Sequence, residues 1–107
     1  MFARLARFEG LTGETAARTL REVSRRRDPL MRGLTGYRGH LDLVDGSNGQ
    51  VVTIAFFDTE ENMLAAERTF DEEMPKHLGH LIGTWAGDRT AGHRTAVERY
   101  EVVVDSR

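Results

Sequence analysis

Imidazole and guanidinium groups are the side chains of this sequence best suited to chemistry, because the chain has no cysteine to act as a nucleophile or metal ligand. His77 and His80 are three residues apart, a spacing that places both imidazoles on one side of a helical turn. Since imidazole titrates near neutral pH, one of them, His77, is a candidate general acid or base. The alternative is a pair of histidines at the surface. No His-Glu-x-x-His motif accompanies them, so no metal site is predicted.

Arginines on the first expected strand are candidates for ligand binding. Arg4 and Arg7 lie on opposite faces of that strand, which should be central, so at least one guanidinium should be buried and need an anionic partner. We expect an internal ion pair with Glu98 or Glu101 of the last strand. The alternative is that Arg7 binds a ligand carboxylate.

His40 alternates with Arg38 and Asp42 on one face of another expected strand, opposite Tyr37. Because that strand should be an edge strand, we expect its polar row to face water. Contact of His40 with a ligand is the alternative.

Several aromatic and methionine side chains could line a pocket. Trp85 lies among glycines, where its ring could cover the core or form a pocket wall. Met63, Phe70 and Met74 recur at helical spacing, which predicts a core stripe that would also line any pocket beneath that helix. Phe56 on a strand is a further candidate ligand contact, and Tyr100 near the end of the chain is a candidate catalytic residue.

Four strands and two helices must position these residues. Alternation and β-branched residues predict strands at 2–9, 37–44, 50–57 and 94–105, and Asn48-Gly49 predicts a tight hairpin between the second and third. Thr12 and Thr59 are expected helix caps. The first helix should end or bend at Asp28-Pro29, and the second should end or restart at Pro75.

Composition restricts the partners. The sequence of 107 residues should form a single domain, and its net charge of −2 gives no reason to expect nucleic acid or an anionic membrane. Arg25-Arg26-Arg27 is expected to complement the negative end of the first helix. No apolar run approaches the ~20 residues of a membrane span. We therefore expect a cytoplasmic protein without a membrane or nucleic-acid partner.

The order β, α, β, β, α, β predicts an α+β, ferredoxin-like fold: a four-stranded antiparallel sheet with two helices on one face. The strand from Gln50 to Phe57 has apolar residues on both faces, so the other face of the sheet should also be covered. A second copy of the chain, packed sheet to sheet, would cover it. We predict a homodimer.

Several framework segments carry a resemblance to a known family: Phe2-Ala-Arg4, Gly36-Tyr-Arg-Gly-His40, the run from Val51 to Glu61, and Val97-Glu-Arg-Tyr-Glu-Val102. On these the chain resembles the antibiotic biosynthesis monooxygenase-like (ABM) domains of the dimeric α+β barrel superfamily, over essentially its whole length. The resemblance implies a pocket between sheet and helices and, for some members, oxidation of a phenolic substrate by O2 without a metal or flavin. No cofactor is therefore expected.

The resemblance also implies, for a subset of relatives, cleavage of heme with an Asn on the first strand, a Trp on the second helix and a His near its end. Here the first position is Ala6, the second falls on Ala66 or Glu67, and only His77 is near the third. Two of three are missing, which argues against heme degradation.

Three functions remain open at this point. The first is a cofactor-independent monooxygenase acting on a small apolar or aromatic compound, with His77 and Tyr100 as catalytic candidates. Its ligand contacts would be Trp85, Arg7, Met63, Phe70 and Phe56. The second is a non-catalytic homodimer that binds a small molecule or acts in stress. The third is an isomerase or dehydratase of the same superfamily.

Overall fold

The computed structural model describes the backbone of residues 1–10, 13–82 and 93–107. The side chains of residues 13–15, 74–75, 77–82 and 93 lie outside this description. The elements follow the predicted order: β1 (Phe2–Glu9), α1 (Gly13–Arg32), β2 (Tyr37–Asp45), β3 (Gln50–Phe57), α2 (Glu60–Ile82) and β4 (His93–Glu101).

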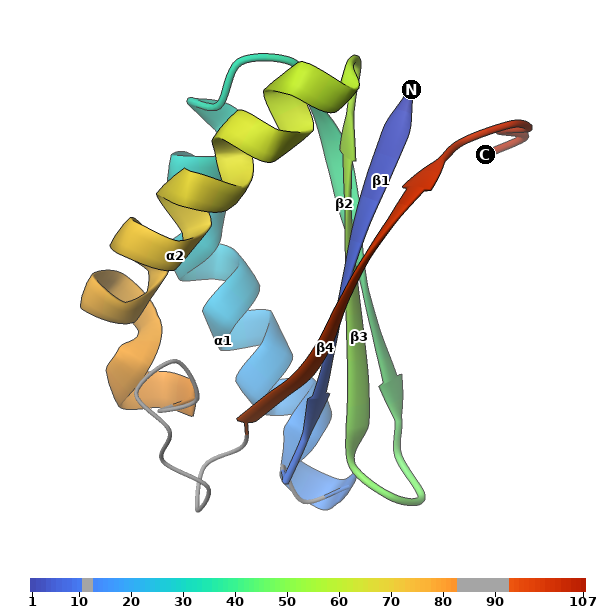
Figure 1. Cartoon of the computed structure of the whole chain (residues 1–107). Helices are drawn as coiled ribbons and strands as arrows, with labels where there is room; N and C mark the ends of the chain where they lie inside the picture. Colours follow the sequence, from blue (N-terminus) through green and yellow to red (C-terminus); the bar gives the residue numbers. More distant parts are fainter. Residues whose placement is uncertain (11–12, 83–92) are drawn as a thin grey trace.

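The strands form one antiparallel sheet in the order β2-β3-β1-β4, so β1 and β3 are central and β2 and β4 are edges. Both helices pack on the same face, and no helix of the described residues covers the other face (Figure 1). We call these the covered face and the open face. The expected ferredoxin-like α+β fold is confirmed.

The core lies between the covered face and the helices. Phe57 is fully buried there, and its ring makes edge-on contacts with Tyr37 and with Phe70 of α2. Met63 and Val23 belong to the same cluster, each from the apolar stripe of its helix. The strands therefore place the even-numbered side chains of β1 and the odd-numbered ones of β3 against the helices.

Neither helix ends at its proline. α1 continues through Pro29 to Arg32, and α2 runs without a break past Pro75 to Ile82. The start of α2 agrees with expectation, since the Thr59 hydroxyl accepts a hydrogen bond from the backbone N–H of Asn62 at 3.1 Å. Thr12, the expected cap of α1, lies outside the described residues.

The hairpin between β2 and β3 forms, but its turn is not the two-residue type expected. Gly49 has a positive φ and Asn48 does not, and residues 46–49 form a four-residue loop closed by Asp45. At the other end of β2, a side chain at Gly36 would collide with the Asp58 carboxylate, so this position requires glycine.

A β-bulge near the start of β2 overturns the prediction for His40. Gly39 has φ of 104°, and the register shifts between Tyr37 and His40. Tyr37 and His40 therefore share the covered face, together with Asp42. The expectation that this polar row faces water is correct for Arg38 but wrong for His40 and Asp42, because strict alternation does not hold across a bulge.

Candidate functional site

A cavity lies between the covered face and the helices. Its described polar lining includes Arg4, Arg27, His40, Asp42, Thr53 and Arg94, and its apolar lining includes Phe8, Met31, Ala55 and Phe70. The space that the centre of a water molecule can occupy is about 40 Å³, room for a few waters or for one small polar group. Arg94 is 29% exposed, so the lining reaches the surface on its side.

His40 stands at the centre of a hydrogen-bonded cluster on one wall of this cavity. Its Nδ1 lies 2.5 Å from the hydroxyl oxygen of Tyr37, and its Nε2 lies 3.2 Å from Oγ of Ser24. The Asp42 carboxylate is 3.5 Å from Nε2. Because both neighbouring hydroxyls can donate or accept, either tautomer of the neutral ring is satisfied.

Burial lowers the pKa of His40, and the nearby charge of Arg27 lowers it further, while Asp42 opposes both effects. The ring is therefore neutral at pH 7 and free to take a proton. Burial also raises the pKa of Tyr37, which keeps that hydroxyl protonated. The pair thus combines a proton acceptor with a proton donor.

Arg27 reaches this wall from α1. Its Nη2 donates to Oδ2 of Asp42 at 2.7 Å, and the two side chains are only 11% and 13% exposed. Arg25 and Arg26 instead pair with Glu22 at the surface. The expectation that all three arginines lie at a solvated helix end is therefore wrong for Arg27, because the helix continues one further turn beyond it.

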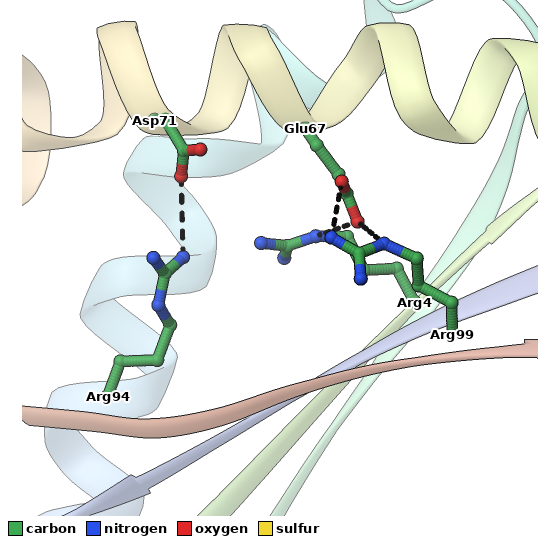
Figure 2. A network of polar contacts seen from close by, with 5 residues as sticks. All are labelled: Arg4, Glu67, Asp71, Arg94 and Arg99. Atoms are coloured by element: carbon green, nitrogen blue, oxygen red, sulfur yellow. Dashed lines mark hydrogen bonds and ion pairs between the residues drawn. The ribbon is translucent and has the colours of Figure 1, made fainter.

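The opposite wall is an arginine network beneath α2, shown in Figure 2. Glu67 projects from α2 toward the sheet and accepts hydrogen bonds from Nε of Arg4 at 3.2 Å and from Nε of Arg99 at 2.5 Å. One turn further along α2, Asp71 pairs with Arg94 at 3.4 Å. Burial opposes ionisation of Glu67, but the hydrogen bonds and charges of Arg99 and Arg4 outweigh it and keep the pKa of that carboxyl below its ordinary value.

Arg4 is the buried cation that the sequence predicts on β1, although its partner is Glu67 on α2 and not a residue of the last strand. Its guanidinium carbon lies 5.0 Å from the centre of the Phe70 ring. Burial lowers the pKa of Arg4, and Glu67 counteracts this. Arg7 does pair with Glu98, at 2.8 Å on the open face.

The site residues predicted from the sequence are split between the two faces. Met63 and Phe70 lie beneath α2, and Phe70 lines the cavity. Arg7, Phe56 and Tyr100 lie on the open face. These three therefore cannot share a sheet–helix pocket with Phe70 within one chain, because their side chains project from the face of the sheet opposite the helices.

On the open face, Tyr100 and Phe56 contact other side chains of this chain. The Tyr100 hydroxyl donates to Glu98, which raises the pKa of Tyr100. The guanidinium of Arg107 lies 3.9 Å from the centre of the Phe56 ring. His77 belongs to α2, but its side chain and the whole of Trp85 lie outside the described residues. The roles of His77, Tyr100 and Trp85 stay predictions.

Sequence reasoning missed four charged residues of the site: Arg27, Glu67, Arg94 and Arg99. Two of them carried a signal. Arg27 follows Val23 by four residues on the apolar stripe of α1, and Glu67 stands between Met63 and Phe70 on the stripe of α2. A charged residue on an apolar stripe indicates a buried partner.

Two further properties bear on function. Within the described part of the chain, no three His, Asp or Glu side chains come together as a metal-binding group. Neither described helix is long and apolar enough to cross a lipid bilayer.

Comparison with known proteins shows what fold the chain shares. No protein-family model matches it, and neither does any curated protein sequence. Among solved structures, a dimeric ferredoxin-like protein from an uncultured marine organism matches 97% of this chain and 96% of its own, with a TM-score of 0.68 and 14% identity.

Two neighbours were solved with bound molecules. The monooxygenase from the gene ActVA-Orf6 of Streptomyces coelicolor, in complex with nanaomycin D, covers 98% of this chain and 92% of its own at a TM-score of 0.64 and 15% identity. A mutant of MhuD with two manganese protoporphyrin IX molecules per active site covers 100% and 99%, with a TM-score of 0.64 and 17% identity. The resemblance noted in the sequence therefore holds for the fold: this chain has the ferredoxin-like fold of antibiotic biosynthesis monooxygenases and of dimeric ferredoxin-like proteins.

Proposed function

We propose that this protein is a homodimeric, cofactor-independent monooxygenase-like enzyme that oxidises a small aromatic compound with O2, with the phenolic oxygen in the cavity of the covered face and the ring extending toward the exposed side at Arg94. One observation carries the proposal: a neutral, half-buried histidine and three arginines line the same cavity. Oxidation of a phenol without a cofactor needs a base to remove its proton and positive groups to stabilise the resulting anion. The fold neighbours that are monooxygenases support the same reading.

In this mechanism His40 removes the phenolic proton. Nε2 is the receiving nitrogen when Nδ1–H donates to the Tyr37 oxygen. The substrate hydroxyl then replaces the Ser24 hydroxyl, which lies 3.2 Å from Nε2, and Asp42 at 3.5 Å stabilises the imidazolium. Arg27, on the same wall as His40, stabilises the phenolate, and Arg4 and Arg94 add positive charge across the cavity. For a phenol with a hydrogen at the para carbon, one atom of O2 becomes the second carbonyl oxygen of a p-quinone. The other leaves as water with the phenolic and para hydrogens, so the substrate itself is the reductant.

The proposal of a homodimer rests on exposed apolar side chains of the open face. Leu41 and Leu43 are 40% and 49% exposed, and they lie beside Ile54 and Val52 of β3. Together with Leu5 of β1 they form an apolar surface across the sheet. A second copy packed against it would remove this surface from water.

The test uses 1-naphthol as the probe. We expect oxygen uptake measured with an electrode to match the formation of 1,4-naphthoquinone, measured by absorbance, and His40→Gln to reduce both about a hundredfold or more. Arg38→Gln, an exposed change on the same strand, is the control and should retain activity. Binding of 1-naphthol is measured separately by calorimetry. Binding without oxygen uptake would contradict the proposed reaction.

The small size of the cavity favours a second candidate, a non-catalytic homodimer that binds a small molecule. This candidate predicts binding of an aromatic probe with no turnover, and it leaves His40 without a chemical role. The calorimetric and oxygen measurements separate the two functions.

The sequence-predicted base His77 needs its own test. If it acts in the reaction, His77→Ala should reduce oxygen uptake while His40→Gln has little effect. If His40 is the base, the order is reversed.

A further inference from the structure

The head group of Arg4 has unused hydrogen-bonding capacity inside the cavity. Its Nε donates to Glu67, and within the described residues neither of its terminal amino groups donates to a side chain. The side chain is 9% exposed and lines the cavity. Four N–H bonds of a buried cation are therefore available to an occupant of the cavity.

Arg94 faces the same space and is held weakly. In Figure 2 the guanidinium of Arg4 extends past Glu67 toward that of Arg94. The only described partner of Arg94 is Asp71, whose side chain is 60% exposed, at 3.4 Å. An exposed pair of this length contributes little stability, so a better anion could replace Asp71.

The charge balance of the cavity favours an anion. Among the described residues, the lining contains three arginines and one carboxylate, that of Asp42, which pairs with Arg27. The carboxylates that pair with Arg4 and Arg94, those of Glu67 and Asp71, lie outside the lining. Burial lowers the pKa of Arg4 most, Glu67 opposes this effect, and the charge of Arg94 lowers the pKa further, as expected of two cations that face the same space.

An apolar ring borders these cations. Phe70 is 5% exposed and lines the cavity beside Arg4. The space of about 40 Å³ accommodates a carboxylate group, and the attached part of a larger ligand would extend toward the exposed side at Arg94.

We propose that the cavity binds aromatic carboxylates, with the carboxylate group held between the guanidinium groups of Arg4 and Arg94 and the ring against Phe70. Two arginines can bind the two oxygens of one carboxylate, an arrangement that adds geometric specificity to charge. This inference takes the cavity of the proposed function as its starting point and names the class of substrate. Asp71 is the internal competitor that the ligand displaces.

Calorimetry with 1-naphthoate tests the proposal. We expect 1-naphthoate to bind at least about tenfold more tightly than 1-naphthamide, which has the same ring without the charge, and more tightly than acetate, which has the charge without the ring. If 1-naphthamide bound as tightly as 1-naphthoate, the cavity would not recognise the negative charge, and the proposal would be wrong. If acetate bound as tightly as 1-naphthoate, the ring would not contribute to binding, and the role given to Phe70 would be wrong.

Two substitutions with opposite expected effects sharpen the test. Arg94→Gln removes one of the two cations and should weaken 1-naphthoate about tenfold or more, whereas Asp71→Asn removes the competitor and should strengthen it several-fold. Unchanged affinity in Arg94→Gln, or weaker binding in Asp71→Asn, would contradict the proposal. Both residues are partly exposed, so the variants should fold, which circular dichroism checks.

Matched controls separate local from global electrostatics. Arg38→Gln and Glu72→Gln make the same charge changes at exposed positions outside the cavity lining, Glu72 next to Asp71 on α2. Both should leave the affinity within about twofold of the parent protein, since exposed charges are screened. If 1-naphthoate binds as predicted and 1-naphthol is not oxidised, the anion site stands and the proposed oxidation fails.

Discussion

The two faces of the sheet differ in a way that an isolated chain does not explain: the covered face contains charged side chains in the core, and the open face exposes apolar side chains to water. The covered face places Arg4, His40 and Asp42 beneath the helices, among buried apolar side chains. The open face exposes Leu41 and Leu43. Charged groups in a core call for partners, and apolar groups on a surface call for cover. These two features are the basis of the proposed ligand site on one face and the proposed second copy of the chain on the other.

The largest effect should come from the apolar core of the covered face. Phe57→Ala should reduce the free energy of unfolding by about 4 kcal/mol, because it empties a fully buried site between Tyr37 and Phe70. Urea denaturation measures it. On the open face, Ile54→Ala should reduce the free energy of unfolding of a monomeric variant much less. An equal reduction would contradict the conclusion that the core lies on the covered face alone.

The arginine network should contribute next. Glu67→Ala leaves the buried guanidinium of Arg4 without its carboxylate and should cost about 2–3 kcal/mol in urea denaturation. Arg99→Ala removes the half-exposed partner of the same carboxylate and should cost less than about 1 kcal/mol. Similar losses in the two variants would contradict the assignment of Arg4 as the buried member.

The open face should determine the oligomeric state. Leu41→Lys places a charge in the middle of the apolar surface and should convert a dimer into a monomer, measured by sedimentation equilibrium. Leu64→Lys changes an exposed leucine of α2 and is the control, with no expected change. A dimer that survives Leu41→Lys would place the interface elsewhere.

The smallest effect is the pH dependence of His40. In the folded protein, burial and then the charge of Arg27 lower the pKa of His40 below its ordinary value of 6.5. Between that folded pKa and pH 6.5, the unfolded chain therefore binds more protons than the folded chain. Stability should therefore be full above pH 6.5 and should fall as the pH drops from 6.5 toward the folded pKa. His40→Gln should remove this part of the pH dependence. A titration followed by nuclear magnetic resonance that gives His40 a pKa above 6.5 would contradict it.

Local patterns along the sequence were sufficient to predict the order of the helices and strands and the apolar face of each. The stripe containing Met63 and Phe70 and the strand from Gln50 to Phe57 are examples. The site was harder to predict because it depends on one bulge and on contacts distant in sequence. Gly39 reverses the face of His40, and Arg4 finds Glu67 across 63 positions. Residue spacing does not indicate the bulge, and although it places Glu67 on the apolar stripe of α2, it does not identify Arg4 as the partner.

Native mass spectrometry of the protein with equimolar 1-naphthoate tests both halves of the central claim at once. The account predicts a dimer that carries one 1-naphthoate per chain, with the ligand lost in Arg94→Gln and the dimer lost in Leu41→Lys. A monomer that still binds 1-naphthoate would contradict the role given to the open face, and a dimer without 1-naphthoate would contradict the role given to the cavity.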